Sequence, residues 1–325
     1  AVVYTAIGGL KAVIYTDTIQ WLVLIGGLVF IGIPIAYNAV GGYEAIKTTL
    51  APEYLSLTNV KWHQILNWSI TIIPIWFVGM TLYQRIYASK GEKEAKKAWL
   101  IAGVFEWPIM AFMGVILGML AKVAATKGMF DGITDATTMD SEMGLPILLA
   151  TILPIGLMGL MLSSYFSAIL STADSCLMAA SGNIVTDIIA KFSKKELSHK
   201  QELCLSQMVT LIVGFLAIVI ASQMQNALEL MLYSYAFMVS GLFVPVIGAL
   251  FWKKSHPTAA FWSMLCGGAT TIILIIADNK LPLGIKLPEH LDANIYGISI
   301  SLILFVTISL YYNNKKEKQN GIQTN

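Results

Sequence analysis

The chain is dominated by a succession of apolar segments, most of them long enough to cross a membrane as a helix. Such a helix needs about 20 mostly apolar residues to span the roughly 30 Å of hydrocarbon in a bilayer. A helix also satisfies its own backbone hydrogen bonds, so it can lie in lipid. The sequence therefore predicts an all-α membrane protein. The expected crossings are residues 12–36, 64–83, 98–121, 155–190, 203–224, 228–252, 257–277 and 293–312.

The composition argues against several other classes of protein. Hydrophobic residues make up 56% of the chain and charged residues only 12%, whereas a typical soluble domain has about 25% charged residues. So little charge argues against a disordered chain, a nucleic-acid-binding protein and an ordinary cytosolic enzyme. The sequence has no Walker A loop, no G-x-G-x-x-G and no H-E-x-x-H motif. Its cysteines and histidines are scattered, so we expect no resident cofactor and no metal site of the zinc type.

Two further apolar segments are too short to cross a membrane. Residues 1–9 end at a Gly8-Gly9 turn, and because the chain does not begin with Met we expect a fragment that starts inside a helix. Residues 143–153 end just before Pro154 and predict a re-entrant or interfacial helix.

The basic residues divide unevenly between the two sides of the membrane that these crossings define. When the Gly8-Gly9 turn is placed in the cytoplasm, 15 of the 21 Lys and Arg residues fall on that side, as the positive-inside rule requires. A miscounted crossing would scramble this asymmetry, so the distribution supports the set of crossings. We expect one membrane domain, residues 1–313, followed by a polar cytoplasmic tail, residues 314–325.

Three acidic residues lie within the expected crossings: Asp17, Glu106 and Asp174. An ionisable side chain at mid-membrane costs roughly 2.5–3.5 kcal/mol on insertion scales, so it should face the bundle interior and mark a pathway. We expect no Lys or Arg at a comparable depth, so these carboxylates should be protonated or meet a cation from solution. Asp17 is either an acid near the interface or an ion relay. Glu106 lies two residues before Pro108. Its side chain either caps or hydrates a kinked helix, or it has a functional role.

One helix carries a stripe of oxygen-bearing side chains about 100° wide, which we call the oxygen ridge. The ridge consists of Ser164, Ser167, Ser171, Asp174 and Ser175, with Thr172 beside it. Membrane serines often bond back to the carbonyl four residues earlier or allow close packing, and this explains Ser163, Ser164 and Ser167 best. Packing does not require the carboxylate of Asp174, whereas hard cations prefer clustered oxygen ligands. The candidate cation ligands are Ser171, Thr172, Asp174 and Ser175.

Proline residues inside two crossings, Pro74 and Pro245, indicate where backbone groups become available to bind ligands. Trp76 lies close to the first proline, and Tyr233 and Tyr235 precede the second. These aromatic side chains either line a substrate cavity or serve as core and interface residues, and both interpretations stay open.

Four stretches carry a family signal: YTAIGGLKAVIYTDTIQ (4–20), YQRIYASKGEKEAKKA (83–98), SAILSTADSCLMAASGNIVTDI (167–188) and FWKKSHPTAAFWSMLCGG (251–268). In order and spacing they resemble the sodium:solute symporter family of sodium/proline, sodium/pantothenate and sodium/glucose transporters. The resemblance implies an inverted-repeat, five-plus-five helix transporter fold. Residues 1–9 would end core helix 4, residues 12–36 would form core helix 5, and residues 64–252 would form core helices 6 to 10, followed by two accessory helices. Core helices 1 to 3 and most of core helix 4 would lie outside this chain, so we expect residues 1–325 alone not to transport.

The resemblance also implies site residues. Half of the family's main sodium site corresponds to the Ala168 carbonyl, Ser171 and Thr172. A second sodium site or exit route found in some members corresponds to Asp17, Ser171, Asp174 and Ser175; some members carry serine at the position of Asp174.

The implied solute site lies elsewhere in the chain. Trp76 corresponds to a substrate-side aromatic of the sugar carriers, whereas Ile72 and Ile75 replace polar sugar contacts. The expected substrate-binding residues are Ile72, Ile75, Trp76, Tyr233 and Tyr235.

The resemblance thus implies a transporter and not an enzyme: a secondary symporter that couples sodium entry to uptake of an amino acid, carboxylate or vitamin rather than a sugar. Sodium is the coupling ion and no other cofactor is implied. The partners are the solute, the lipid bilayer and the remaining N-terminal helices of the same protein, and the expected location is the bacterial inner membrane. The alternatives are an ion channel, a membrane-embedded enzyme with Asp17 and Asp174 as an acid pair, and a sensory membrane domain.

Overall fold

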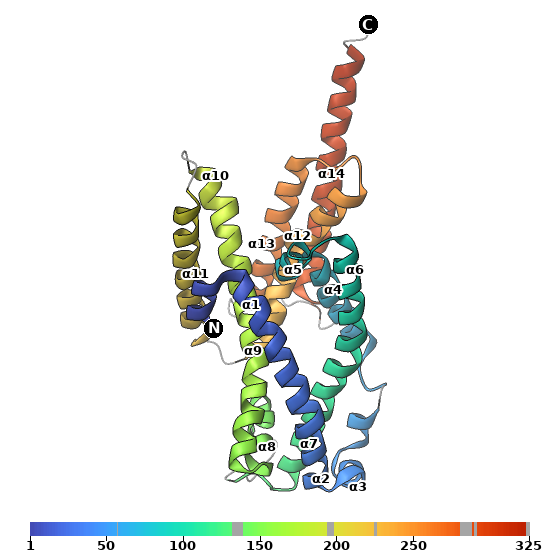
Figure 1. The fold of residues 1–325 in the computed structure, drawn as a ribbon. Coiled ribbons are helices and arrows are strands. Elements are labelled where there is room, and N and C mark those ends of the chain that lie inside the picture. Colours follow the sequence, from blue (N-terminus) through green and yellow to red (C-terminus); the bar gives the residue numbers. More distant parts are fainter. Residues whose placement is uncertain are drawn as a thin grey trace. The chain divides into compact units, whose positions relative to one another are not determined.

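The computed structural model describes the chain except residues 57, 132–138, 194–197, 224–225, 280–287, 289–290 and 323–325. All regular elements of the described residues are helices (Figure 1). Seven of these helical runs are long and apolar enough to cross a membrane, which confirms the expectation of an all-α chain with many crossings. They are Val2–Val40, Trp62–Tyr87, Ile155–Phe192, His199–Ala221, Ala227–Phe251, Pro257–Ala277 and Ala293–Lys315.

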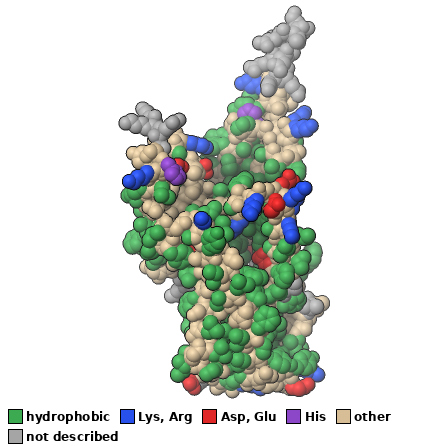
Figure 2. Space-filling model, viewed as in Figure 1, with side chains coloured by type: hydrophobic (Ala, Val, Ile, Leu, Met, Phe, Trp, Pro, Cys, Tyr) green, Lys and Arg blue, Asp and Glu red, His purple; other side chains and the backbone are tan. Residues whose placement is uncertain are grey.

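Large apolar side chains stay exposed along these helices, as expected of surfaces that face lipid. Phe30 is 72% exposed and Phe215 is 66% exposed. Hydrophobic side chains cover much of the face visible in Figure 2. In water such continuous exposure would drive aggregation, so the surface is suited to a hydrocarbon environment.

The chain divides into two compact units, which are described separately. The first comprises Ala1–Asn59 and Tyr83–Ile220, and the second comprises Val60–Leu82 and Ala221–Asn325.

The first unit begins with α1 (Val2–Leu24), which continues through a π-helical segment (Ile25–Gly32) into α2 (Ile33–Val40). Inside α1 the backbone breaks at Gly9, where φ is 59° and ψ is −162°. A positive φ is readily tolerated only by glycine. The expected separation of residues 1–9 from the following crossing is therefore confirmed.

The crossing expected at 98–121 is not one continuous α-helix. It consists of α6 (Glu92–Phe105), a π-helical segment (Glu106–Met110) and α7 (Ala111–Thr126). Pro108 lies within the π-helical segment and has no backbone N–H, so the regular hydrogen-bond ladder cannot pass through this position unchanged.

A short apolar helix precedes the longest helical run of the unit. Helix α8 (Gly144–Ile152) buries Leu148 and Leu149 completely, and its nine residues are too few to cross a bilayer. After Pro154 the chain enters α9 (Ile155–Asn183), which continues through a π-helical segment into α10 (Ala190–Phe192). This confirms the long helix expected at 155–190. The unit also contains α3 (Gly42–Thr49), α11 (His199–Ala221) and, from Tyr83 onward, α5 (Met80–Tyr87).

The second unit packs α4 (Trp62–Val78), α12 (Ala227–Phe251), α13 (Pro257–Asn279) and α14 (Ala293–Ile322). Helix α4 runs through Pro74 and ends at Val78. Gly79 separates it from α5 (Met80–Tyr87). Helix α12 likewise continues through Pro245. The proline positions therefore do not interrupt these two helices.

Small and polar residues allow the helices of the second unit to approach closely. A Cβ atom on Gly248 of α12 would overlap the ring of Phe305 on α14. The Nδ2 of Asn294 donates to Oγ1 of Thr71 at 2.7 Å, and the buried hydroxyl of Thr271 donates to Ser240 at 2.7 Å. Such interhelical hydrogen bonds join helices that lipid does not drive together.

Candidate functional site

The oxygen ridge of α9 faces protein at its most polar positions. Asp174 and Ser164 are completely buried, and Ser175 is 7% exposed. Helix α1 lies side by side with α9 in the first unit (Figure 1). The carboxylate therefore points into the bundle, where an ionisable membrane residue is expected to have a function.

Ser164, the first residue of the ridge, and its neighbour Ser163 have structural roles. Ser163 Oγ donates to the Gly159 carbonyl at 2.8 Å, and Ser164 Oγ donates to the Leu160 carbonyl at 3.0 Å. A Cβ atom on Gly27 would overlap Ser164 Oγ, so the π-helical segment after α1 touches α9 here. Both serines behave as expected of packing residues.

The half-site expected for the main sodium ion lies one turn further along α9. Ala168 and Ser171 are half-buried and Thr172 is exposed. Thr172 Oγ1 donates to the Ala168 carbonyl at 3.3 Å, so two expected ligands already lie next to each other. A hydroxyl that donates this bond keeps its lone pairs for a cation. The assignment of these three residues to sodium stays a prediction.

Asp174 forms a hydrogen bond with the part of α1 that precedes the Gly9 break. The hydroxyl of Tyr4 donates to Asp174 Oδ2 at 2.5 Å. The other carboxylate oxygen, Oδ1, is buried and has no hydrogen-bond partner among the described residues. Tyr4 was not identified as a site residue from the sequence, although it opens the first family-like stretch.

Asp17 of α1 forms an ion pair with Arg85 of α5. Arg85 Nη2 lies 2.7 Å from Asp17 Oδ2 and also donates to Ser175 Oγ. The expectation that no basic residue lies at the depth of the acids is therefore wrong for Asp17. Arg85 follows the crossing expected at 64–83, but α5 continues to Tyr87 and the long side chain reaches back to the acid.

Asp17 and Ser175, both expected at the second cation site, are thus held together by the only arginine in the sequence. Sequence reasoning missed Arg85 as a site residue. The signal was the Q-R pair that opens the second family-like stretch.

Several buried oxygen atoms of α1, α5 and α9 have no hydrogen-bond donor among the described residues. The atoms concerned are Asp17 Oδ1, Gln20 Oε1, Gln84 Oε1 and Asp174 Oδ1, none of which has a hydrogen-bond partner among the described residues. Buried acceptors without donors are costly. A monovalent cation would satisfy such atoms, because carboxylate and amide oxygens are hard ligands.

The residues expected to bind the solute lie in the second unit and divide into two groups. Ile75 is buried against Val239, and Tyr235 packs on the same cluster. Trp76 and Ile72 are 44% and 40% exposed. The structure therefore brings Ile75 and Tyr235 together.

The other tyrosine of this expected set has a local partner. The Tyr233 hydroxyl donates to Glu229 at 2.5 Å, one helical turn away on α12. Its assignment to the solute stays a prediction.

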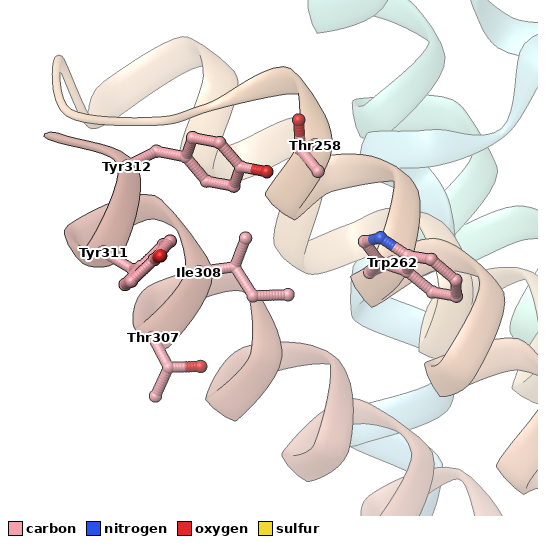
Figure 3. Close-up of a pocket in the computed structure, with 6 residues that line it drawn as sticks. All are labelled: Thr258, Trp262, Thr307, Ile308, Tyr311 and Tyr312. Atoms are coloured by element: carbon pink, nitrogen blue, oxygen red, sulfur yellow. The ribbon is translucent and has the colours of Figure 1, made fainter. Parts of the chain in front are cut away.

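Two further features of the chain are Glu106 and a groove on the surface of the second unit. Glu106 is exposed at the start of the π-helical segment, so both alternatives for its role stay open. A groove of about 340 Å³ lies between α13 and α14 (Figure 3). It is lined by Thr258, Trp262, Thr307, Ile308, Tyr311 and Tyr312, and it contains none of the expected site residues.

Comparisons with known proteins agree on one group. A family model described as Sodium:solute symporter family matches residues 1–267. The chain is 25% identical to sodium/glucose cotransporter 1 of Oryctolagus cuniculus, over 95% of this chain and 54% of that protein. It is 28% identical to the high-affinity proline transporter PutP of Bacillus subtilis, over 95% of this chain and 63% of that protein.

The fold also matches a solved structure. A Na+-coupled sialic acid symporter in a substrate-bound outward-open state superposes with a TM-score of 0.74 and 23% sequence identity. The match covers 95% of this chain and 64% of that one. The chain thus spans between about half and two thirds of the length of these similar proteins.

Proposed function

Because this chain belongs to the sodium:solute symporter family, we propose that its protein is a secondary transporter that couples sodium entry to the uptake of a small organic solute. The family and the similar proteins are transporters, so the chain is not an enzyme, and the alternative of Asp17 and Asp174 as a catalytic acid pair is set aside. The protein is an integral, multi-pass membrane protein, and we place it in the bacterial inner membrane.

The buried carboxylate of Asp174 carries the proposal. It lies inside a membrane bundle, has one oxygen atom without a donor among the described residues, and stands on the same helix as a series of hydroxyl groups. Keeping such a group in a membrane is costly unless a cation or proton compensates it. A pathway for a coupling ion explains why the cost is tolerated.

We assign the sodium ligands as follows. One ion binds the Ala168 carbonyl, Ser171 and Thr172, together with groups outside this chain. A second cation uses Asp17, Ser171, Asp174 and Ser175. The described proximity of Asp17 to Ser175 supports the second assignment. The sialic acid symporter of the same fold has a novel Na+-site in its substrate-bound outward-open state.

Coupling then follows from differential affinity. Sodium that binds one conformation more tightly shifts the population toward that conformation, and the solute gains affinity by the same factor. The shift cannot exceed the difference between the ion's binding free energies in the two states.

For the solute we propose an amino acid, a carboxylate or a vitamin. On α4 the proposed wall comprises the exposed Ile72 and Trp76 and the buried Ile75, none of which offers a side-chain acceptor for sugar hydroxyls, and buried hydroxyls without partners are penalised. Tyr233 and Tyr235 of α12 complete the proposed wall. Glucose, myo-inositol, mannose and proline carriers all occur among the similar proteins.

Uptake into proteoliposomes that contain the complete protein tests this proposal. Labelled proline, pantothenate, a monocarboxylate and glucose are each offered with an inward sodium gradient or with an equal potassium gradient. We expect saturable uptake of one of the first three solutes, driven only by sodium. Sodium current without co-transport would favour a channel, and uptake that ignores the sodium gradient would refute sodium coupling.

A further inference from the structure

A buried polar cluster joins α1, α5 and α9 of the first unit. We call it the Arg85 cluster. Its members are Tyr4, Asp17, Gln20, Arg85, Asp174 and Ser175. All of them except Arg85 can offer oxygen atoms to a cation, and Arg85 itself is a cation. We propose that the guanidinium of Arg85 is a built-in competitor of the second coupling ion, an inference that rests on the proposed function.

The first step concerns the atoms that Arg85 holds. Its Nη2 donates to Asp17 Oδ2 and to Ser175 Oγ. The Ser175 hydroxyl already donates its hydrogen to the Ser171 carbonyl at 2.7 Å, so the oxygen meets Arg85 through a lone pair. A sodium ion at the second site would bind the same hydroxyl oxygen through its remaining lone pair, and the same carboxylate through Asp17 Oδ1, which has no donor among the described residues. The guanidinium and the ion therefore compete for the Ser175 hydroxyl and the Asp17 carboxylate, because two cations on the same two groups repel each other.

The second step concerns charge. Asp17 and Asp174 supply two carboxylates, and Arg85 contributes one positive charge that it keeps at any physiological pH. A sodium ion placed near the guanidinium would be repelled at short range in a medium of low dielectric constant. Arg85 thus lowers the sodium affinity of the cluster both by holding its ligands and by its charge.

The third step concerns where the guanidinium goes when sodium binds. The Arg85 side chain is 33% exposed, whereas Asp174 is completely buried. Arg85 also lies near the end of α5, three residues beyond the division between the two units. A partly solvated, long side chain at a helix end can move away from the carboxylates without crossing the core.

The consequence is a device for unloading sodium. When the ion leaves, Arg85 returns to Asp17 and Ser175 and neutralises a carboxylate that would otherwise rebind sodium. The charge distribution of the sequence places Arg85 on the cytoplasmic side, where a sodium-coupled importer must release its ion.

Chemical modification of the unaltered protein gives one test. Phenylglyoxal reacts with accessible guanidinium groups, and mass spectrometry reports modification at Arg85. With the complete protein in detergent, we expect sodium to raise the rate of Arg85 modification severalfold over potassium at equal ionic strength. A rate that is equal in the two salts, or lower in sodium, would overturn the proposal.

Substitution gives the second test. In Arg85→Gln we expect the sodium concentration for half-maximal binding to fall about tenfold, equivalent to about 1.4 kcal/mol, and release of radioactive sodium to slow. Lys93→Gln removes one positive charge from an exposed residue of the same basic region. This control should change neither the sodium concentration for half-maximal binding nor the rate of sodium release. Arg85→Lys should lie between wild type and Arg85→Gln. An unchanged or weaker sodium affinity in Arg85→Gln would refute the competition.

The two failures are distinguishable. If wild-type protein shows no sodium-dependent uptake or binding, the proposed function itself fails. If wild type depends on sodium but Arg85→Gln binds it no more tightly, only the role of Arg85 fails. In an Asp17→Asn background the Arg85→Gln substitution should have little further effect, because the two residues act through the same contact.

Discussion

The hydroxyl of Tyr4 donates a hydrogen bond of 2.5 Å to Oδ2 of Asp174, which lies 170 residues later in the chain. The bond links the short helical segment before Gly9 to the buried part of α9. The same two segments carry the first and third family-like stretches of the sequence. A segment too short to cross the membrane therefore contacts the candidate site directly.

Removing the Tyr4 hydroxyl should destabilise the first unit. In Tyr4→Phe the carboxylate of Asp174 loses its donor, and a buried polar group without a partner costs about 1–3 kcal/mol. We expect a lower unfolding temperature in detergent, measured by thermal denaturation. Tyr15→Phe makes the same change at a side chain that is 65% exposed and should have little effect. If both variants unfold at the same temperature, the hydrogen bond does not contribute to stability.

Removing a hydroxyl from the expected main sodium site should weaken sodium activation. Ser171→Ala or Thr172→Ala deletes one oxygen ligand, and we expect the sodium concentration for half-maximal uptake to rise roughly tenfold, about 1.4 kcal/mol. The measurement is initial uptake by the complete transporter over a series of sodium concentrations, with the expression level checked. Ser163→Ala, on the same helix but bonded to the Gly159 carbonyl, is the control. Sodium dependence equal to wild type in both variants would remove these residues from the site.

The positions of the helices were predictable because the signal is local. A crossing is defined by the length of an apolar segment, and the Gly8-Gly9 pair indicated the break that the structure has at Gly9. The π-helical segment at Glu106–Met110 was harder to predict from the sequence. A proline indicates that a helix must adjust, but not how: α4 continues as an α-helix through Pro74, whereas the helix around Pro108 is a π-helix.

The residues of the candidate site were only partly predictable, because the sequence signal is local whereas the site joins different helices. Helical periodicity identified Asp174 and Ser175 on one face of α9, and both are buried. Periodicity does not reveal which neighbouring helix covers that face, so Tyr4 and Arg85 were missed as partners. Arg85 in particular lies outside the apolar segment, and only the path of α5 and the reach of its side chain place it beside Asp17.

Adding one methyl group at Gly27 should loosen the contact between the helix that follows α1 and α9. A Cβ at Gly27 would overlap Ser164 Oγ and lie 3.0 Å from Met161 Cε. Overpacking of this kind costs typically about 1–3 kcal/mol, so we expect Gly27→Ala to unfold at a lower temperature in detergent. Gly26→Ala is a matched control, because nothing lies within 4 Å of a Cβ there. Ser164→Ala should partly rescue Gly27→Ala, and a stability of Gly27→Ala equal to Gly26→Ala would show that the helices do not touch closely at this point.

The stability of the second unit should depend on pH through Asp292, which precedes α14. Asn67 Nδ2 on α4 donates to Asp292 Oδ1 at 3.1 Å. Partial desolvation by the surrounding protein raises the pKa of the Asp292 carboxyl above its ordinary value. The folded protein therefore keeps this proton at pH values where the unfolded chain has lost it. The free energy of unfolding must then fall as pH rises through the interval between the ordinary and the raised pKa. Above that interval Asp292 is ionised in both the folded and the unfolded protein, so a further rise in pH no longer changes its contribution to stability.

Thermal unfolding of wild type and Asp292→Asn, followed from acidic to neutral pH, measures this contribution. The asparagine cannot ionise, so we expect the difference in unfolding temperature between the two proteins to shift in favour of Asp292→Asn as pH rises. The shift should be modest, because the residue remains in contact with water. Asp131→Asn, the same change at an exposed carboxylate of the first unit, controls for the loss of one negative charge. A difference that stays constant with pH, or that changes in the opposite direction, would show that ionisation of Asp292 does not oppose folding.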